Sequence, residues 1–163
     1  EVFEVPEDIR LIVKDFFKTR LPLDTPSRDG TTRRPEPLEL EKYARELRDE
    51  LDDFVMGKSY HRVTIAHSAE LIECVIEITD ENGPITIDGN SISKGDLTIS
   101  GLLAKLDANL REQFSQWVYI QRGLRFFQGP KIYLYKKPRL IDWTRTQAKI
   151  DAGEIIGEVI TET

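Results

Sequence analysis

The sequence is poor in the residues that bind metals or form disulfides. Its 163 residues include one cysteine, Cys74, and two histidines. A single cysteine cannot form a disulfide within the chain, and this set is too small for a structural zinc site of cysteines and histidines. We therefore expect a protein of the reducing cytoplasm, and no residue pattern indicates a cofactor.

Long apolar runs are also missing. A membrane-spanning helix needs about 18 or more apolar residues in a row, whereas this chain is 39% hydrophobic and 32% charged, and no run approaches that length. The first residues do not show the basic and then apolar pattern of a secretory signal. We expect a soluble protein with no membrane contact.

The motifs of several common enzyme classes are absent. The sequence has no glycine-rich phosphate loop, no dinucleotide fingerprint, no Gly-x-Ser-x-Gly turn and no His-Glu-x-x-His pair. No lysine has an acid two residues before it, which excludes the usual strand arrangement of metal-dependent nucleases. A non-catalytic protein is therefore the first expectation.

Two hydrophobic periods along the chain predict a single α+β domain. Helical spacing indicates helices at about 6–20 and 40–55, a third that begins after Ser93 or Asp96 and reaches 114, and a last one capped by Asp142 or Thr144. Residues 21–37 hold four of the eight prolines and should form a loop or arm. We expect about four helices packed on a mainly antiparallel sheet of about five short strands.

The strands are expected in two groups. Alternating patterns cover 60–67 and 71–78, and the turn dipeptide at 82–83 leads to a short strand at 85–87 that ends before residues 88–90. The second group covers 117–121, 124–127 and 131–135. Both groups therefore look like short antiparallel meanders.

Charge is unevenly divided along the chain. The net charge is -6, but residues 117–149 contain eight bases and the single acid Asp142, together with seven of the fourteen aromatic residues. Cations neutralise phosphates and aromatic rings stack on bases, so this composition suits single-stranded nucleic acid or another anionic partner, such as an acidic protein surface. The predicted binding residues of this C-terminal hairpin are Arg125, Phe127, Lys131, Tyr133, Tyr135, Lys136, Lys137 and Arg139.

A purely structural explanation stands beside this hypothesis. The aromatic residues can belong to the core, with Tyr133 and Tyr135 in cross-strand pairs. The bases can face the segment 36–53, where eight acids stand against three bases. In that case the two charge groups neutralise each other within one molecule.

Two further functions remain open. The amphipathic helix at 40–55 and the proline-rich arm can dock a partner protein or form a homodimer. Alternatively, His61 and His67 on one strand and Glu73 and Glu77 on the next can hold a divalent metal for hydrolysis, if the strand register brings their faces together. Cys74, which lies among isoleucines, is expected to be a buried apolar residue and not a nucleophile.

Overall fold

A computed structural model of the chain describes residues 32–80, 90–94, 98, 101, 117–120 and 123–162. Their elements are α2 (Pro37–Val55), β1 (Tyr60–His67), β2 (Ile72–Thr79), β3 (Asn90–Lys94), β4 (Trp117–Ile120), β5 (Gly123–Gln128), β6 (Lys131–Lys136), the 3-10 helix η4 (Leu140–Trp143) and α4 (Arg145–Glu162). The α+β class is confirmed. The expected numbers of about five strands and four helices are not matched, since the described residues form six strands and two α-helices. The helix expected at 6–20 and the strand at 85–87 lie outside the described residues, and so does the helix expected up to 114 except for residues 98 and 101.

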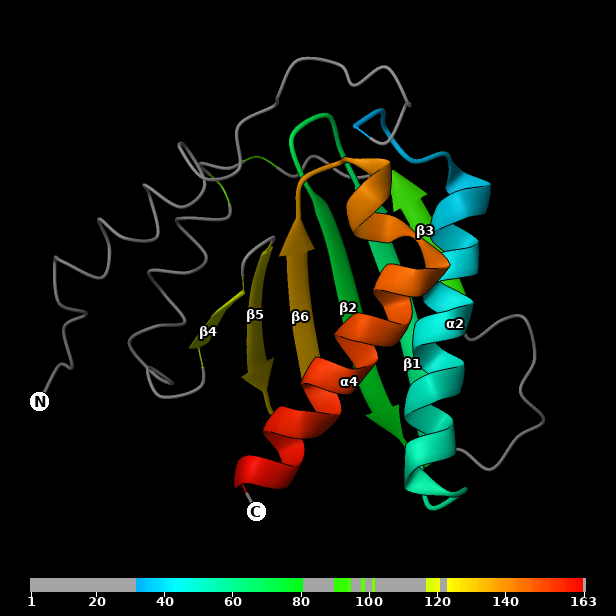
Figure 1. Cartoon of the computed structure of the whole chain (residues 1–163), viewed down its shortest axis with the longest axis vertical. Helices are drawn as coiled ribbons and strands as arrows, with labels where there is room; N and C mark the ends of the chain where they lie inside the picture. Colours follow the sequence, from blue (N-terminus) through cyan, green and yellow to red (C-terminus); the bar gives the residue numbers. More distant parts are fainter. Residues whose placement is uncertain are drawn as a thin grey trace, which may run out of the picture.

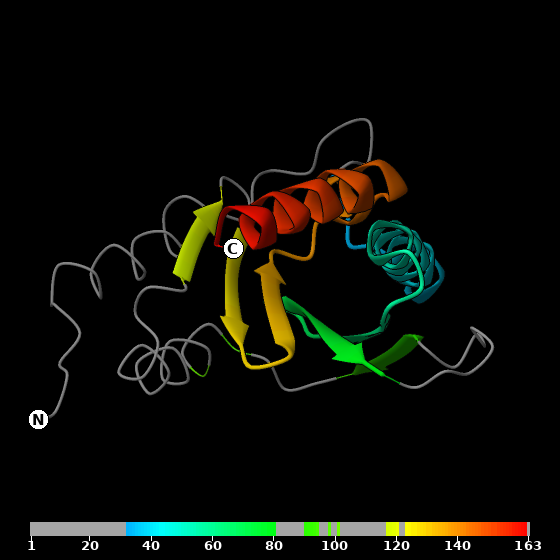
Figure 2. The same ribbon diagram turned by 90° about the horizontal axis from the view of Figure 1, so that it is seen from below.

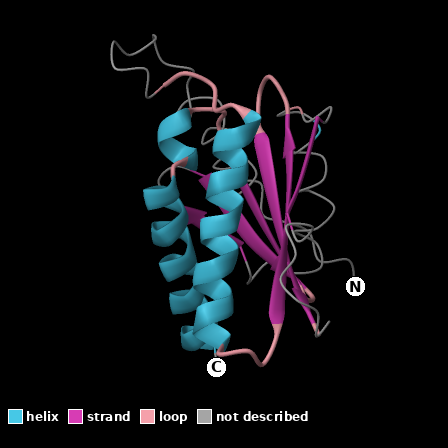
Figure 3. Ribbon diagram, turned by 90° about the vertical axis from the view of Figure 1, so that its right-hand side faces the viewer, coloured by secondary structure: helices cyan, strands magenta, loops and turns pink. Residues whose placement is uncertain are grey.

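The six strands form one sheet in the order β3-β1-β2-β6-β5-β4. All neighbouring strands are antiparallel except β1 and β3, which run parallel. Helices α2 and α4 lie side by side on one face of the sheet and run in the same direction (Figures 1 and 3). Seen from below, the sheet curves around the two helices (Figure 2). The mainly antiparallel sheet is thus a prediction that holds.

Strand β3 corrects part of the expected meander. The sequence pattern ends that meander at residues 88–90 and makes Ser93 a candidate helix cap, but Asn90 is the first residue of β3 and Ser93 lies within it. β3 pairs with the outer edge of β1, where Ile65 lies opposite Ile92. Unpaired backbone groups at a sheet edge favour such an added strand, and local turn residues do not reveal it.

Helix α2 forms where its apolar spacing predicts it. Pro37 occupies the first turn, where its missing N–H has no helical partner to lose. The backbone N–H of Glu36 donates to the Glu39 carboxylate at 3.1 Å, which satisfies one group at the helix start. The helix ends at Met56 and Gly57, whose φ angles of 51° and 76° are left-handed.

Thr144 caps helix α4. Its hydroxyl oxygen accepts a hydrogen bond from the backbone N–H of Gln147 at 3.1 Å, in the manner of an N-cap. Asp142, the other candidate cap, lies in η4 and is fully buried. The sequence therefore located the start of this helix correctly, and Thr144 is the residue that caps it.

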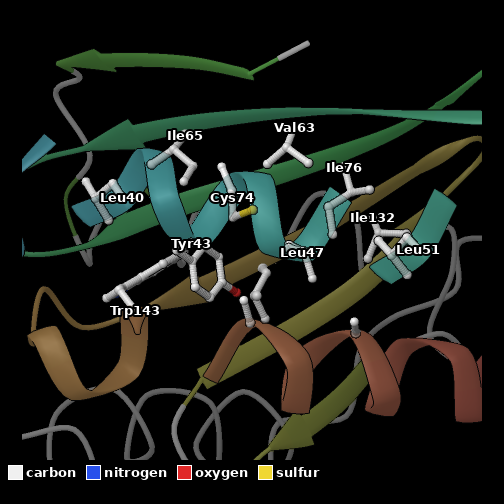
Figure 4. Close-up of a cluster of buried hydrophobic side chains, with 14 of the residues drawn as sticks. Leu40, Tyr43, Leu47, Leu51, Val63, Ile65, Cys74, Ile76, Ile132 and Trp143 are labelled. Atoms are coloured by element: carbon white, nitrogen blue, oxygen red, sulfur yellow. The ribbon is translucent and has the colours of Figure 1, made fainter. Parts of the chain in front are cut away.

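The core lies between the sheet and the two helices (Figure 4). Cys74 is fully buried there, and burial raises the pKa of its thiol to about 12. It therefore packs as a small apolar residue, as predicted. Neither α2 nor α4 combines the length and apolar character that a membrane span requires.

Candidate functional site

The predicted binding residues of the hairpin are divided between the two faces of the sheet. Arg125 on β5 lies directly opposite Leu134 on β6, and Leu134 belongs to the core beneath the helices. Directly opposed residues share a face, so Arg125 and Phe127 point to the helix side. Tyr133 and Tyr135 alternate with Leu134 and therefore point to the other side. The predicted binding residues of the hairpin therefore do not share one face of the sheet.

The aromatic rings of the hairpin pack on one another. Phe126 stacks on Tyr133 with their ring centroids 4.6 Å apart. Phe126 and Tyr135 are 2% and 1% exposed, and the Tyr135 hydroxyl donates to the Glu73 carboxylate at 2.5 Å. Burial and the negative charge of Glu73 raise the pKa of Tyr135 far above its usual range. This arrangement supports the cross-strand alternative for the tyrosines.

Lys136, the last residue of β6, lies in a closed polar centre. Its ammonium donates to the Asp151 carboxylate of α4 at 2.6 Å and to the backbone carbonyl of Asp142 at 2.5 Å. It also lies 4.3 Å from the centroid of the Trp143 ring and 4.7 Å from that of Tyr43. Lys136 has no exposed surface, and neither has Asp151.

The Asp151 carboxylate accepts hydrogen bonds from two further donors. The Tyr43 hydroxyl of α2 donates to Asp151 Oδ2 at 2.5 Å, and the Gln147 amide donates to Asp151 Oδ1 at 2.9 Å. Burial, and next the charge of Asp151, raise the pKa of Tyr43 well above its usual range. One buried carboxylate therefore joins α2, β6 and α4. The Lys136 ammonium is bound within the molecule by these contacts.

Arg125 also forms ion pairs with residues of α4. Its guanidinium bonds the carboxylates of Glu158 and Glu154, the latter at 3.2 Å, and its side chain is 2% exposed. Burial opposes the charged form, but the bonds to Glu158 and Glu154 raise the pKa of Arg125 above its ordinary value. Arg125 therefore ties β5 to the second half of α4.

Helix α4 also pairs with the acidic helix α2. Arg145 Nη2 lies 2.9 Å from the Glu46 carboxylate and Lys149 Nζ lies 3.4 Å from it. The hydrogen bond from Arg145, with the added charge of Lys149, lowers the pKa of Glu46. The basic segment is thus largely neutralised within the molecule, by acids of both α2 and α4.

Lys137 has different surroundings from Lys136. The residue is only 5% exposed, yet no described residue places a carboxylate within ion-pair distance of its ammonium. Burial lowers the pKa of Lys137; Glu70 opposes this shift and the positive charge of Arg139 adds to it.

Two arginines lie at the same end of the sheet as Lys137, which follows the β6 residue paired with Ile72. The Arg34 guanidinium donates to the carbonyls of Ser68 and Ala69, in the turn between β1 and β2, at 2.5 and 3.1 Å. Arg139 Nε donates to the Asp142 carboxylate at 3.0 Å. The chain around Arg34 is held there by a hydrogen bond from the Leu140 N–H to the Arg33 carbonyl, at 2.8 Å. We call Arg34, Lys137 and Arg139 the basic end.

Lys131, the remaining predicted base, does not belong to the basic end. It begins β6 beside the turn at 128–130, whereas Lys137 follows the last residue of the same strand. A strand rises about 3.3 Å per residue, so the length of β6 separates the two lysines. Only Lys137 and Arg139 of the eight predicted binding residues lie together at this end.

The candidate metal ligands do not come together. In the β1–β2 register, His61 lies opposite Ile78 and His67 opposite Ile72, on the helix side. Glu73 and Glu77 lie opposite residues 66 and 62, on the other side. The register therefore separates the imidazoles from the carboxylates. The described residues contain no group of three or more side chains suited to a metal.

His61 has a partner that the strand pattern did not indicate. Its Nδ1 lies 2.8 Å from Asp52 Oδ1, and its backbone N–H donates to the same oxygen at 2.9 Å. Asp52 belongs to the last turns of α2, so this pair joins the helix end to the start of β1. This pair gives His61 a structural contact at the start of the strand.

The apolar face of the helix predicted at 40–55 is used within the molecule. Leu40, Leu47 and Leu51 lie in the core against the sheet. The large apolar side chains that α2 exposes are Leu38 and Phe54, near its two ends. The face proposed for a partner or a second copy is therefore mostly covered by the chain's own strands.

Comparisons with protein-family models, with curated proteins and with solved structures find no match to this chain. We therefore infer function from the contacts of the described residues.

Tyr43, Asp151 and Arg34 were not among the residues predicted from the sequence. A signal was present for Asp151, because it shares the apolar side of α4 with Ala148, Ala152 and Ile155. An acid at such a position needs a buried donor. No comparable signal marks Arg34, whose contacts are with backbone carbonyls distant in sequence.

Proposed function

We propose that this protein is a non-catalytic binding module that holds an anionic group of a partner at the basic end. The observation that carries the proposal is the surroundings of Lys137, a residue that is 5% exposed and has no carboxylate partner among the described residues. A buried cation normally has a partner, because removing it from water costs free energy that only an opposite charge or hydrogen bonds offset. An anion from outside the described residues supplies such a partner.

The neighbouring bases support this interpretation by contrast. Lys136 has Asp151, Arg125 has Glu158, and Arg145 has Glu46. Burial and the charge of Arg139 disfavour the ammonium form of Lys137 in the absence of an anion, and a bound anion reverses that effect.

The basic end is also held in place before any partner arrives. Ser68 and Ala69 orient Arg34, and Asp142 orients Arg139. Side chains that are already ordered lose less conformational entropy when they bind. A weak but specific anion site is therefore the activity that this arrangement favours.

The test compares two lysine variants. Lys137→Met removes the proposed ligand and keeps an apolar side chain of similar length, whereas Lys58→Met removes an exposed lysine just beyond the far end of α2. Binding of a fluorescein-labelled acidic peptide and of a labelled poly-dT oligonucleotide is measured by fluorescence anisotropy at low salt. We expect at least one probe to bind the parent chain, to weaken as salt rises, and to bind Lys137→Met at least about tenfold less tightly.

The matched control decides the outcome. Lys58→Met has the same change in net charge, so it should bind as the parent chain does. The proposal is wrong if neither probe binds at low salt, or if the two variants lose affinity equally, because a general charge effect then accounts for the binding.

A further inference from the structure

Strand β4 is the last strand of the sheet on the β5 side (Figure 1). It pairs with β5, and no other strand of the described residues pairs with its outer edge. The N–H and C=O groups of an edge strand can add a strand from another chain, and natural proteins usually prevent this with a charged residue, a proline or a cover. The outer edge of β4 is therefore a candidate surface for a partner strand.

The composition of β4 differs from that of the strand at the opposite edge. Its four residues read Trp-Val-Tyr-Ile and include no charged residue, proline or glycine. Aromatic and β-branched residues of this kind favour strand pairing. At the other edge, β3 reads Asn-Ser-Ile-Ser-Lys, which is mostly polar and ends in a lysine. Of these two edge strands, only β3 therefore carries a residue type that discourages an added strand.

The register with β5 indicates which backbone groups of β4 point outward. Ile120 pairs with Gly123 across two residues, and a pair that encloses so short a turn is hydrogen-bonded. Hydrogen-bonded and non-hydrogen-bonded pairs alternate along an antiparallel ladder. Val118 therefore bonds β5, whereas Trp117 and Tyr119 direct their N–H and C=O groups to the outer edge.

We infer that β4 pairs with β4 of a second copy of this chain, so that the two sheets join into one. A two-fold axis through Val118, perpendicular to the sheet, makes the two strands antiparallel and keeps each residue on its own face. Trp117 of each copy then exchanges hydrogen bonds with Tyr119 of the other, and Val118 lies opposite its own equivalent. The outward backbone groups are thus self-complementary, and no charged residue of β4 opposes the pairing.

This inference concerns a different surface from the basic end and does not depend on the proposed function. The paired residues are an aromatic opposite an aromatic and a valine opposite a valine, and such pairs are favourable across strands. A second copy of β4 therefore satisfies both the backbone and the side-chain pattern of the edge.

The first measurement is the oligomeric state of the full chain by analytical ultracentrifugation. A series from about 1 to 200 µM covers the range of a weak dimer, and we expect the mass to rise from one chain towards two. Val118→Glu places two acids opposite each other in the dimer, but an acid opposite Arg125 within each chain. It should therefore weaken the dimer at least about tenfold and leave the chain folded. Ile120→Glu makes the same charge change beyond the paired residues and should weaken the dimer far less.

Cysteine variants test the register and do not depend on the glutamate variants. Val118→Cys places two thiols opposite each other, where the Cα atoms of a non-hydrogen-bonded pair lie about 4.5 Å apart, within the range of a disulfide. In Ile120→Cys the two thiols are four residues apart along the paired strands, which is about 13 Å. The native Cys74 is fully buried. Mild oxidation should therefore cross-link Val118→Cys, and neither Ile120→Cys nor the parent chain, on a non-reducing gel.

A parent chain that stays single over the whole concentration range would overturn the inference. It would also be overturned if Val118→Glu and Ile120→Glu weakened the dimer equally, because the dimer would then use another surface. Equal cross-linking of the two cysteine variants would likewise show that β4 does not pair in this register.

Discussion

Lys136 Nζ and Asp151 Oδ2 lie 2.6 Å apart, and neither side chain has any exposed surface. The next residue, Lys137, is also largely buried but has no carboxylate partner among the described residues. Lys136 ends strand β6 and meets Asp151 of helix α4. Lys137 follows the strand, and the charge of Glu70, in the turn between β1 and β2, acts on its ammonium. We therefore expect Lys136 to stabilise the fold and Lys137 to destabilise it in the absence of a ligand.

The first prediction concerns the closed pair. Lys136→Met leaves the Asp151 carboxylate in the interior with only the Tyr43 and Gln147 donors. Loss of one partner of a buried ion pair costs about 3–5 kcal/mol of the free energy of unfolding. Urea denaturation measures this loss. Lys136→Met combined with Asp151→Asn removes both charges and should recover part of it, while a loss below about 1 kcal/mol in the single variant would contradict the buried pair.

The second prediction concerns Lys137 in the absence of a ligand. Lys137→Met removes the charge of a largely buried residue that has no carboxylate partner among the described residues, so we expect the free energy of unfolding to rise by about 0.5–2 kcal/mol. The same denaturation experiment measures it, with Lys58→Met as the neutral control. A clear loss of stability would mean that Lys137 has a stabilising partner in the free chain.

The third prediction concerns two glycines. A Cβ added at Gly123 would lie 2.5 Å from the Tyr135 carbonyl oxygen and 2.6 Å from Lys136 Cγ, whereas one at Gly153 in α4 would meet no atom within 4 Å. Gly123→Ala should destabilise the chain by about 1–3 kcal/mol, because β5 and β6 must separate. Gly153→Ala should stabilise it by about 0.5–1 kcal/mol, because alanine favours a helix. Thermal denaturation of both variants checks the opposite signs.

The fourth prediction concerns acid pH. The hydrogen bond from Arg145 lowers the pKa of Glu46 in the folded chain below its ordinary value of 4.5. The unfolded chain therefore binds more protons near that pH, so this contribution to stability is complete above the unfolded pKa and is lost as the pH falls through the folded one. For a pair that is mostly exposed on the arginine side, the loss is about 0.2–1 kcal/mol.

Glu46→Gln tests this contribution. We expect the variant to lose less stability than the parent chain as the pH falls from about 6 to 3, measured as the midpoint of thermal unfolding at each pH. Asp53→Asn is the control, since Asp53 is an exposed acid of α2 with no ion pair to another described residue. Equal pH dependence of stability in the Glu46 variant and the parent chain would show that the Glu46–Arg145 pair does not stabilise the protein in solution.

Local patterns were sufficient for several elements of the fold. The apolar spacing from Leu40 to Leu51 predicts α2, and the alternation in β1, β2, β5 and β6 predicts those strands. The turn at 128–130 joins β5 and β6 as expected, and Thr144 begins α4. These features depend on contacts between residues close in sequence, so periodicity and turn chemistry report them directly.

Other features depend on which strands meet and in what register. The parallel pairing of β3 with β1, and the separation of His61 from Glu73, follow from strand alignment, and a shift of one residue reverses every face. The burial of Arg125 likewise follows from its position opposite Leu134. No local pattern specifies these alignments.

The pairing of charges could not be predicted from the sequence either. Composition alone reveals that residues 117–149 are rich in bases and that most acids lie elsewhere. It does not reveal that Asp151 neutralises Lys136, that Glu158 neutralises Arg125, or that Lys137 meets no carboxylate of the described residues. Ion pairing falls steeply with distance, and the packing of α4 across the sheet sets those distances. The packed chain therefore decides which bases stabilise the fold and which one can receive a partner.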